Sequence, residues 1–104
     1  MTQRELLATV ASLLQEAYGA RLRGVVLYGS EARGEAEPDS DIDILVLLQG
    51  PIELWQDIQT ITEALYPLQL KLDRPLSAIP ADADAYEAQD RSLYRNARRE
   101  GVGV

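Results

Sequence analysis

The chain has no cysteine and no histidine among its 104 residues. Without cysteine it can form neither disulfides nor thiolate zinc sites, and without histidine it has no imidazole base and no Ser–His or Cys–His nucleophile pair. Any catalysis by this chain must therefore use carboxylates, hydroxyls, backbone amides and cations.

Long apolar runs and positive charges are also scarce. The apolar runs are too short to cross a bilayer, and Met1–Glu5 lacks the basic and apolar regions of a signal peptide, so we expect a cytoplasmic protein without a membrane partner. Seventeen acidic residues against ten basic ones give a formal net charge of −7. This charge repels a phosphate backbone, so we expect no direct nucleic-acid partner.

The length and the ordinary globular composition predict a single domain over residues 1–104. Thr2 and Glu5 have the spacing of a helix capping box, and apolar residues then recur at helical spacing. This pattern predicts a first helix from Thr2 to Tyr18.

A second helical face begins near Ile52 and is interrupted by Pro67. Because proline removes an intrahelical hydrogen bond, we expect this helix to end or kink near Tyr66. The segment Leu68–Asp73 also alternates as a half-buried strand would, and this alternative stays open. Trp55 and Tyr66 lie on or near the apolar face, where core packing is the expected role.

Three short apolar segments predict β-strands at Gly24–Tyr28, Asp41–Leu48 and Pro75–Ile79. An acidic loop is expected at Ala81–Asp90, followed by a last helix from Ser92 to Gly101. These elements predict an α/β fold, a small mixed sheet with helices packed on one face and a site open at the end of the first two strands.

Asp41 and Asp43 stand at the start of an otherwise apolar strand. Side chains two residues apart on a strand project from the same face, so both carboxylates can reach one site. Two such charges are costly to bury together unless a cation lies between them. An all-oxygen site suits Mg²⁺ or Mn²⁺, and Mg²⁺ often completes its shell with substrate phosphates.

Gly29 and Ser30 directly follow the first predicted strand. A tight turn here would direct backbone N–H groups and the Ser30 hydroxyl toward phosphate oxygens. The segment between this turn and the carboxylates is polar and contains Gly34 and Pro38, which indicates a loop with at most one helical turn. The sequence thus predicts a phosphate turn beside a carboxylate pair.

Gly29-Ser30, ten intervening residues and then Asp41-Ile42-Asp43 resemble the signature of the DNA polymerase β-like nucleotidyltransferases. The string "GSEARGEAEPDSDIDILV" is similar to that of their smallest branch, the minimal nucleotidyltransferases, as are the chain length and the ending "SLYRNARREGV". The resemblance implies that Gly29 and Ser30 hold the phosphates of ATP and that Asp41 and Asp43 are catalytic ligands of Mg²⁺ or Mn²⁺.

Arg33, in the same loop, is a candidate contact to the nucleotide, although an arginine in a charged loop is often only solvated or paired with glutamate. Many active family members also carry a third carboxylate on the strand after the second helix, where "RPLSAI" offers none. Asp73 could serve as a metal ligand only if that strand starts early, and it is otherwise a solvated turn residue.

The resemblance also implies a partner. Minimal nucleotidyltransferases pair with HEPN-domain proteins as antitoxin and toxin, so this chain is expected to transfer AMP from ATP to a tyrosine of a HEPN ribonuclease. One alternative is a non-catalytic antitoxin that blocks the toxin sterically. Another is an adenylyltransferase for small molecules such as aminoglycosides, which the lack of a substrate domain disfavours.

Overall fold

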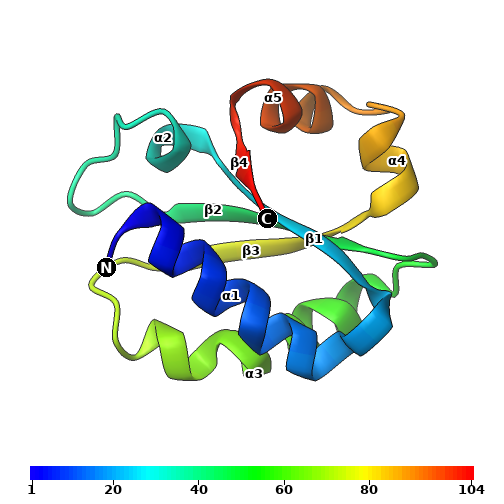
Figure 1. Cartoon of the computed structure of the whole chain (residues 1–104), viewed down its shortest axis with the longest axis horizontal. Helices are drawn as coiled ribbons and strands as arrows, with labels where there is room; N and C mark the ends of the chain where they lie inside the picture. The colour runs from blue at the N-terminus through cyan, green and yellow to red at the C-terminus, as the bar shows by residue number, and fades with distance from the viewer.

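The computed structural model describes all residues, Met1–Val104, and contains one four-stranded sheet of order β3-β2-β1-β4 (Figure 1). The strands are β1 (Leu22–Tyr28), β2 (Ile42–Leu48), β3 (Leu76–Asp82) and β4 (Val102–Gly103). β1 is antiparallel to both β2 and β4, whereas β2 and β3 are parallel. The predicted mixed sheet is therefore confirmed, and β4 is an addition that the sequence did not indicate.

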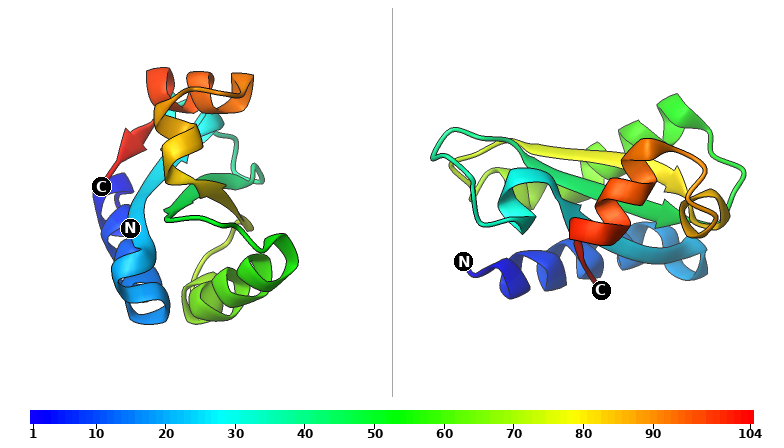
Figure 2. Two further views of the ribbon diagram at one scale, coloured as in Figure 1. Left: turned by 90° about the vertical axis from the view of Figure 1, so that its right-hand side faces the viewer. Right: turned by 90° about the horizontal axis from the view of Figure 1, so that it is seen from above.

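The two long helices pack against each other on one face of the sheet, and the short helices α4 and α5 lie on the opposite side (Figure 2). None of the helices is long and apolar enough to span a membrane. The helices are α1 (Gln3–Tyr18), α2 (Gly29–Ala32), α3 (Leu54–Gln69), α4 (Ala83–Glu87) and α5 (Ser92–Glu100), with a 3₁₀ turn, η1, at Gly19–Arg21.

The start of α1 is a reciprocal cap. The Glu5 N–H donates to Thr2 Oγ1 at 3.1 Å, and the Thr2 N–H donates to Glu5 Oε1 at 2.9 Å. This confirms the predicted capping box and the first helix.

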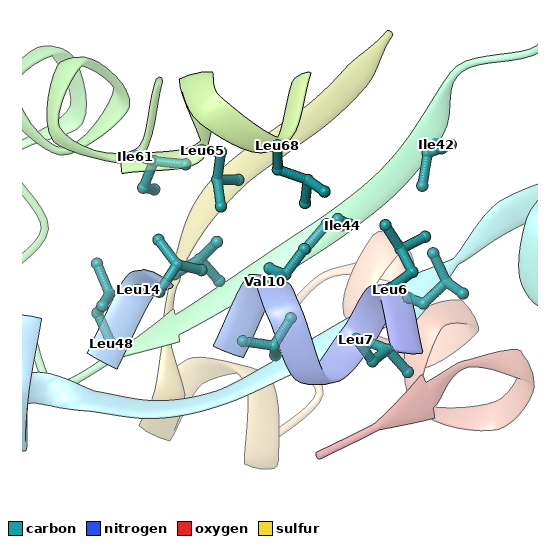
Figure 3. Close-up of a cluster of buried hydrophobic side chains, with 13 residues drawn as sticks. Leu6, Leu7, Val10, Leu14, Ile42, Ile44, Leu48, Ile61, Leu65 and Leu68 are labelled. Atoms are coloured by element: carbon teal, nitrogen blue, oxygen red, sulfur yellow. The ribbon is translucent and has the colours of Figure 1, made fainter. Parts of the chain in front are cut away.

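Alternate residues of β2 enter two different hydrophobic clusters. Ile42 and Ile44 join the larger cluster, which α1 and α3 complete from their side of the sheet (Figure 3). Leu45 joins a smaller cluster on the other face, with Tyr86 of α4 and Tyr94 of α5. The long helices back one face as expected, and the short helices additionally cover part of the other.

Of the two expectations for Pro67, an end or a kink near Tyr66, the end is wrong, because α3 continues to Gln69 with Pro67 inside it. Pro67 lies in the last turn of α3, so the intrahelical hydrogen bond that its missing N–H removes is near the end of the helix. Leu68, only 2% exposed, packs in the core and holds this turn in helical form. The alternative of a strand from Leu68 is therefore wrong as well.

Two further predictions are corrected. Trp55 and Tyr66 do not pack in the core but are 79% and 58% exposed, because α3 turns only a narrow stripe toward the sheet. The acidic segment Ala81–Asp90 is not simply a loop. It contains the end of β3 and α4, and the Asp82 side chain caps α4 by accepting from the Asp84 and Ala85 N–H groups.

Asp57 of α3 is buried and joins this helix to Tyr18 at the end of α1 and to Arg21 of η1. Its carboxylate accepts from Arg21 Nη1 and Nη2 at 2.9 and 3.1 Å, from the Tyr18 hydroxyl at 2.8 Å and from the Glu53 N–H at 2.9 Å. Burial alone would raise the pKa of Asp57, but the hydrogen bonds from Arg21 and Tyr18 lower it below its usual value. Burial and the Asp57 bond raise the pKa of Tyr18 to about 12.

Asp57→Asn is expected to reduce the free energy of unfolding at pH 7 by roughly 2–3 kcal/mol, because charged hydrogen bonds are lost at a buried site. A carboxyl whose pKa is lowered by folding stabilises the protein above its unfolded pKa of about 4 and loses that effect as the pH falls. The difference from wild type should therefore shrink below about pH 4. Urea unfolding at pH 7 and below about pH 4 measures the difference in free energy of unfolding from wild type, with the exposed Asp90→Asn as control. An Asp57→Asn variant as stable as wild type at pH 7 contradicts the expectation.

Candidate active site

The phosphate turn and the carboxylate pair predicted from the sequence meet where β1 ends and β2 begins, at one end of the two central strands of the sheet. Tyr28 at the end of β1 pairs with Asp43 on β2. Gly29 follows with φ +74°, and a Cβ atom placed on it would lie 2.6 Å from Asp43 Oδ2. Only glycine fits both this backbone conformation and this contact, so the two halves of the motif touch.

Asp41 and Asp43 belong to the face of the sheet that α5 partly covers. Ile42 and Ile44 are buried toward α1 and α3, so the alternation of β2 directs Asp43 to the other side. Asp41 directly precedes β2, and its charge acts on Asp43. Burial and the charge of Asp41 raise the pKa of Asp43. Burial and the charge of Asp43 raise the pKa of Tyr28. The site is therefore electronegative and favours a cation.

Ser30 lies in α2, the short helix that starts directly at the turn. Tyr28 precedes this helix and supplies no side-chain cap. The first N–H groups of a helix have no partner within it, so those of Gly29 and Ser30 make no hydrogen bond inside α2. The single helical turn allowed for in the sequence is thus present, beside the carboxylates.

Arg33 ends α2 and faces α5. Its guanidinium lies 3.1 Å from Glu100 Oε2 and 3.5 Å from Glu35 Oε2. A surface hollow of about 290 Å³ lies between Gly29, Arg33 and α5, where Asn96 and other α5 residues line it. The role of α5 as one wall of this hollow was not found from the sequence.

The sequence allowed Asp73 as a metal ligand only if the strand after the second helix started early, and it does not. β3 begins at Leu76, so Asp73 precedes the strand and is exposed, as a solvated turn residue would be. The residue that pairs with Asp43 on β3 is Ser77. No group of three or more acidic, histidine or cysteine side chains in the chain could hold a metal ion.

Arg74 is a further residue of this region that the sequence did not reveal. Its Nε donates to the Ser40 carbonyl at 2.8 Å, directly before Asp41, and its Nη1 donates to Glu31 Oε2 at 2.7 Å. The Glu31–Arg74 pair is mostly buried. Arg74 therefore joins the helix after the phosphate turn to the segment that enters the carboxylate strand.

The two carboxylates fit a hard divalent cation. Mg²⁺ is commonly bound by one or two protein carboxylates together with phosphate oxygens and water, and Asp41 and Asp43 beside the Gly29 turn match that set of donors.

Mg²⁺ or Mn²⁺ is expected to raise the melting temperature of the wild type, and Gly29→Ala is expected to abolish that rise, because the added methyl group displaces Asp43. Gly34→Ala is the matched control, since Gly34 has φ +72° but no atom within 4 Å of the added Cβ. Both variants should lose roughly 1–2 kcal/mol from left-handed backbone strain. Thermal unfolding with and without cation measures this, and a normal cation response in Gly29→Ala contradicts the expected contact.

Arg74→Gln is expected to speed amide hydrogen exchange in residues 30–42 by roughly tenfold or more, because two charge-assisted hydrogen bonds are lost. Lys71→Gln is the control, since it removes a nearby but exposed charge. Exchange followed by mass spectrometry of peptides measures the effect. If residues 30–42 exchange equally in both variants, Arg74 does not hold this segment.

The chain is similar to proteins that are already known. Residues 7–88 match the family model described as a nucleotidyltransferase domain. A Methanocaldococcus jannaschii protein that carries the name of a protein adenylyltransferase is 28% identical over 102 residues, which cover 97% of this chain and 96% of the relative.

Two crystal structures of toxin–antitoxin pairs are similar in fold. A mutant of the pair MntA–HpeT has a TM-score of 0.63 and 19% identity, covering 100% of this chain and 72% of that one. A toxin–antitoxin structure with AMP-PNP has a TM-score of 0.58 and 22% identity, covering 92% of this chain and 69% of that one. The family match spans most of this chain, so the protein belongs to the nucleotidyltransferase domain family and is a nucleotidyltransferase.

Proposed function

We propose that this chain is a single minimal nucleotidyltransferase domain, residues 1–104, that transfers AMP from ATP to a tyrosine of a HEPN-domain ribonuclease toxin. In this role it is the antitoxin of the pair. The observation that carries the proposal is the contact of Asp43 with Gly29, which joins a cation site to a phosphate turn.

Each residue of the site has a proposed role. Asp41 and Asp43 hold Mg²⁺, or Mn²⁺ in its place, and the backbone at Gly29 and Ser30 binds the triphosphate together with the Ser30 hydroxyl. Arg33 exchanges its carboxylate partners for phosphate when ATP enters. Asp73 is left out of the metal site because it lies before β3 and is exposed.

The proposed reaction is an in-line displacement at the α-phosphorus of ATP. The tyrosine oxygen forms a bond to this phosphorus, the bond to the bridging oxygen of the β-phosphate breaks, and pyrophosphate and the hydroxyl proton leave. When bound, the metal ion neutralises charge on the phosphates as they react. The chain itself orients the triphosphate at the Gly29 turn, which keeps the α-phosphorus beside the two aspartates.

Three observations support ATP and a toxin as the substrates. The M. jannaschii relative bears the name of a protein adenylyltransferase, and one similar fold was crystallised as a toxin–antitoxin pair with AMP-PNP. The net charge of −7 favours contact with a basic, RNA-binding partner over contact with nucleic acid. We further propose that the reaction takes place in the cytoplasm.

A second candidate is a binding antitoxin that does not transfer AMP. Ser77, rather than a carboxylate, pairs with Asp43 on β3, so the acidic group consists of two residues only. Such a protein would keep the fold and block the toxin by contact alone.

The two candidates differ in a mass measurement. The chain is expressed with the product of the neighbouring open reading frame, given ATP and Mg²⁺, and the partner is weighed as an intact protein. We expect a gain of one or more AMP units that Asp41→Asn or Asp43→Asn abolishes. Asp39→Asn, an exposed acid in the same loop, is the matched control and should leave the gain intact.

Each outcome has a clear meaning. A stable complex whose partner gains no mass favours the binding antitoxin and contradicts transfer. A mass gain that survives in Asp43→Asn contradicts the proposed site while leaving the reaction itself standing. Absence of both complex and mass gain contradicts the proposed partner.

A further inference from the structure

One side of α3 forms an exposed stripe without charge. The stripe consists of Trp55, Gln59, Thr62, Tyr66 and Leu70, which recur at helical spacing and are all exposed. Trp55 is 79%, Tyr66 58% and Leu70 68% exposed. Between Leu54 and Leu70 the only exposed charged side chain is Glu63, in a chain of which 26% of residues are charged.

A shallow hollow runs beside the stripe, between α3 and β3. Its volume is about 100 Å³, and most of its lining residues are hydrophobic, including Leu65, Tyr66 and Leu76. β3 is the outer strand of the sheet on this side. The stripe therefore borders an apolar hollow rather than a polar rim.

The stripe can pack against the same stripe of a second copy when the two α3 helices run antiparallel. An antiparallel two-fold axis near residues 60 and 61 of α3 sets Trp55 against Tyr66 of the second copy and Gln59 against Thr62. The aromatic pairs then lie at both ends of the contact, about 16 Å apart along the helix. The short Thr62 side chain at the centre allows the two helices to approach closely.

Charge also favours a second copy at this face. Two chains of net charge −7 repel each other over most approaches, but no side chain of the stripe itself is charged. Glu63 beside the stripe accepts from Gln59 Nε2 at 3.2 Å, so its carboxylate already has a partner within the chain. A basic partner would instead be drawn to the acidic surfaces. An acceptor for group transfer must reach the Asp41–Asp43 pair, and Asp43 alternates with Ile42 and Ile44, which face α1 and α3, so it lies on the opposite face of the sheet from α3.

The area of the stripe suits a reversible dimer. Trp55, Tyr66 and Leu70 together expose roughly 400 Å², taking full areas of about 150–250 Å² for large side chains. With Gln59 and Thr62, two copies would bury on the order of 1,000 Å² in total, at the lower end of specific interfaces. Such a contact is expected to form at micromolar or higher concentration.

We propose that the chain forms a two-fold symmetric dimer through the α3 stripe, with α3 packed antiparallel against α3 of the second copy. The dimer leaves both Asp41–Asp43 sites facing outward. It does not depend on the transfer reaction and is tested without nucleotide or toxin.

Trp55 provides a direct probe, because it is the only tryptophan in the chain. Sedimentation equilibrium of the pure protein is expected to show a mass that rises with concentration from 11.5 kDa toward twice that value. Trp55 emission should shift to shorter wavelength over the same concentration range, because the indole leaves water.

Thr62→Glu places two like charges near the two-fold axis and should weaken the dimer at least about tenfold, with red-shifted emission at all concentrations. Threonine to glutamate at an exposed helical position does not oppose folding. Ala8→Glu, which adds the same charge to the exposed side of α1, is the matched control and should dimerise like wild type.

Three results would overturn the proposal. The first is a monomer with constant Trp55 emission at every concentration. The second is a dimer that Thr62→Glu leaves unchanged, which would locate the contact elsewhere. The third is a shift of Trp55 emission only when a different protein is added, which would assign the stripe to that partner.

Discussion

The close contact between Gly29 and Asp43 is the constraint on which the site depends. The Asp43 carboxylate occupies the space that a side chain at Gly29 would take, and the left-handed backbone of Gly29 turns the chain into α2 at that point. The pairing of Tyr28 with Asp43 fixes both residues at the same level of the sheet. The Gly29 turn, for which we propose phosphate binding, and the aspartates, for which we propose cation binding, are thus brought together by the register of two strands.

The two faces of the sheet differ in how fully helices cover them. The face under α1 and α3 carries the larger core and the Asp57–Arg21 pair, which make it the structural side. The other face is only partly covered by α4 and α5, so the aspartates stay accessible there. Arg74 lies in the connection between α3 and β3. It donates to Glu31 and to the Ser40 carbonyl, near the two ends of the loop between the Gly29 turn and Asp41.

The sequence predicted what depends on neighbouring residues. The Thr2 cap, the apolar strands, the Gly29 turn and the Asp41–Asp43 pair all follow from local spacing and side-chain chemistry. The Arg74–Glu31 pair joins residues 43 apart and the Arg33–Glu100 pair joins residues 67 apart, and no local pattern marks either. Trp55 was misjudged because helical spacing gives the direction of an apolar face but not how much of it the sheet covers.

The most direct measurement of the central claim is anomalous diffraction from crystals grown with Mn²⁺ and a non-hydrolysable ATP analogue. A single Mn²⁺-bearing site at Asp41 and Asp43, with the phosphates of the analogue against Gly29 and Ser30, is the expected result. Mn²⁺ bound away from both aspartates, or phosphates bound elsewhere on the sheet, would contradict the claim that the Gly29 turn and Asp43 form one site.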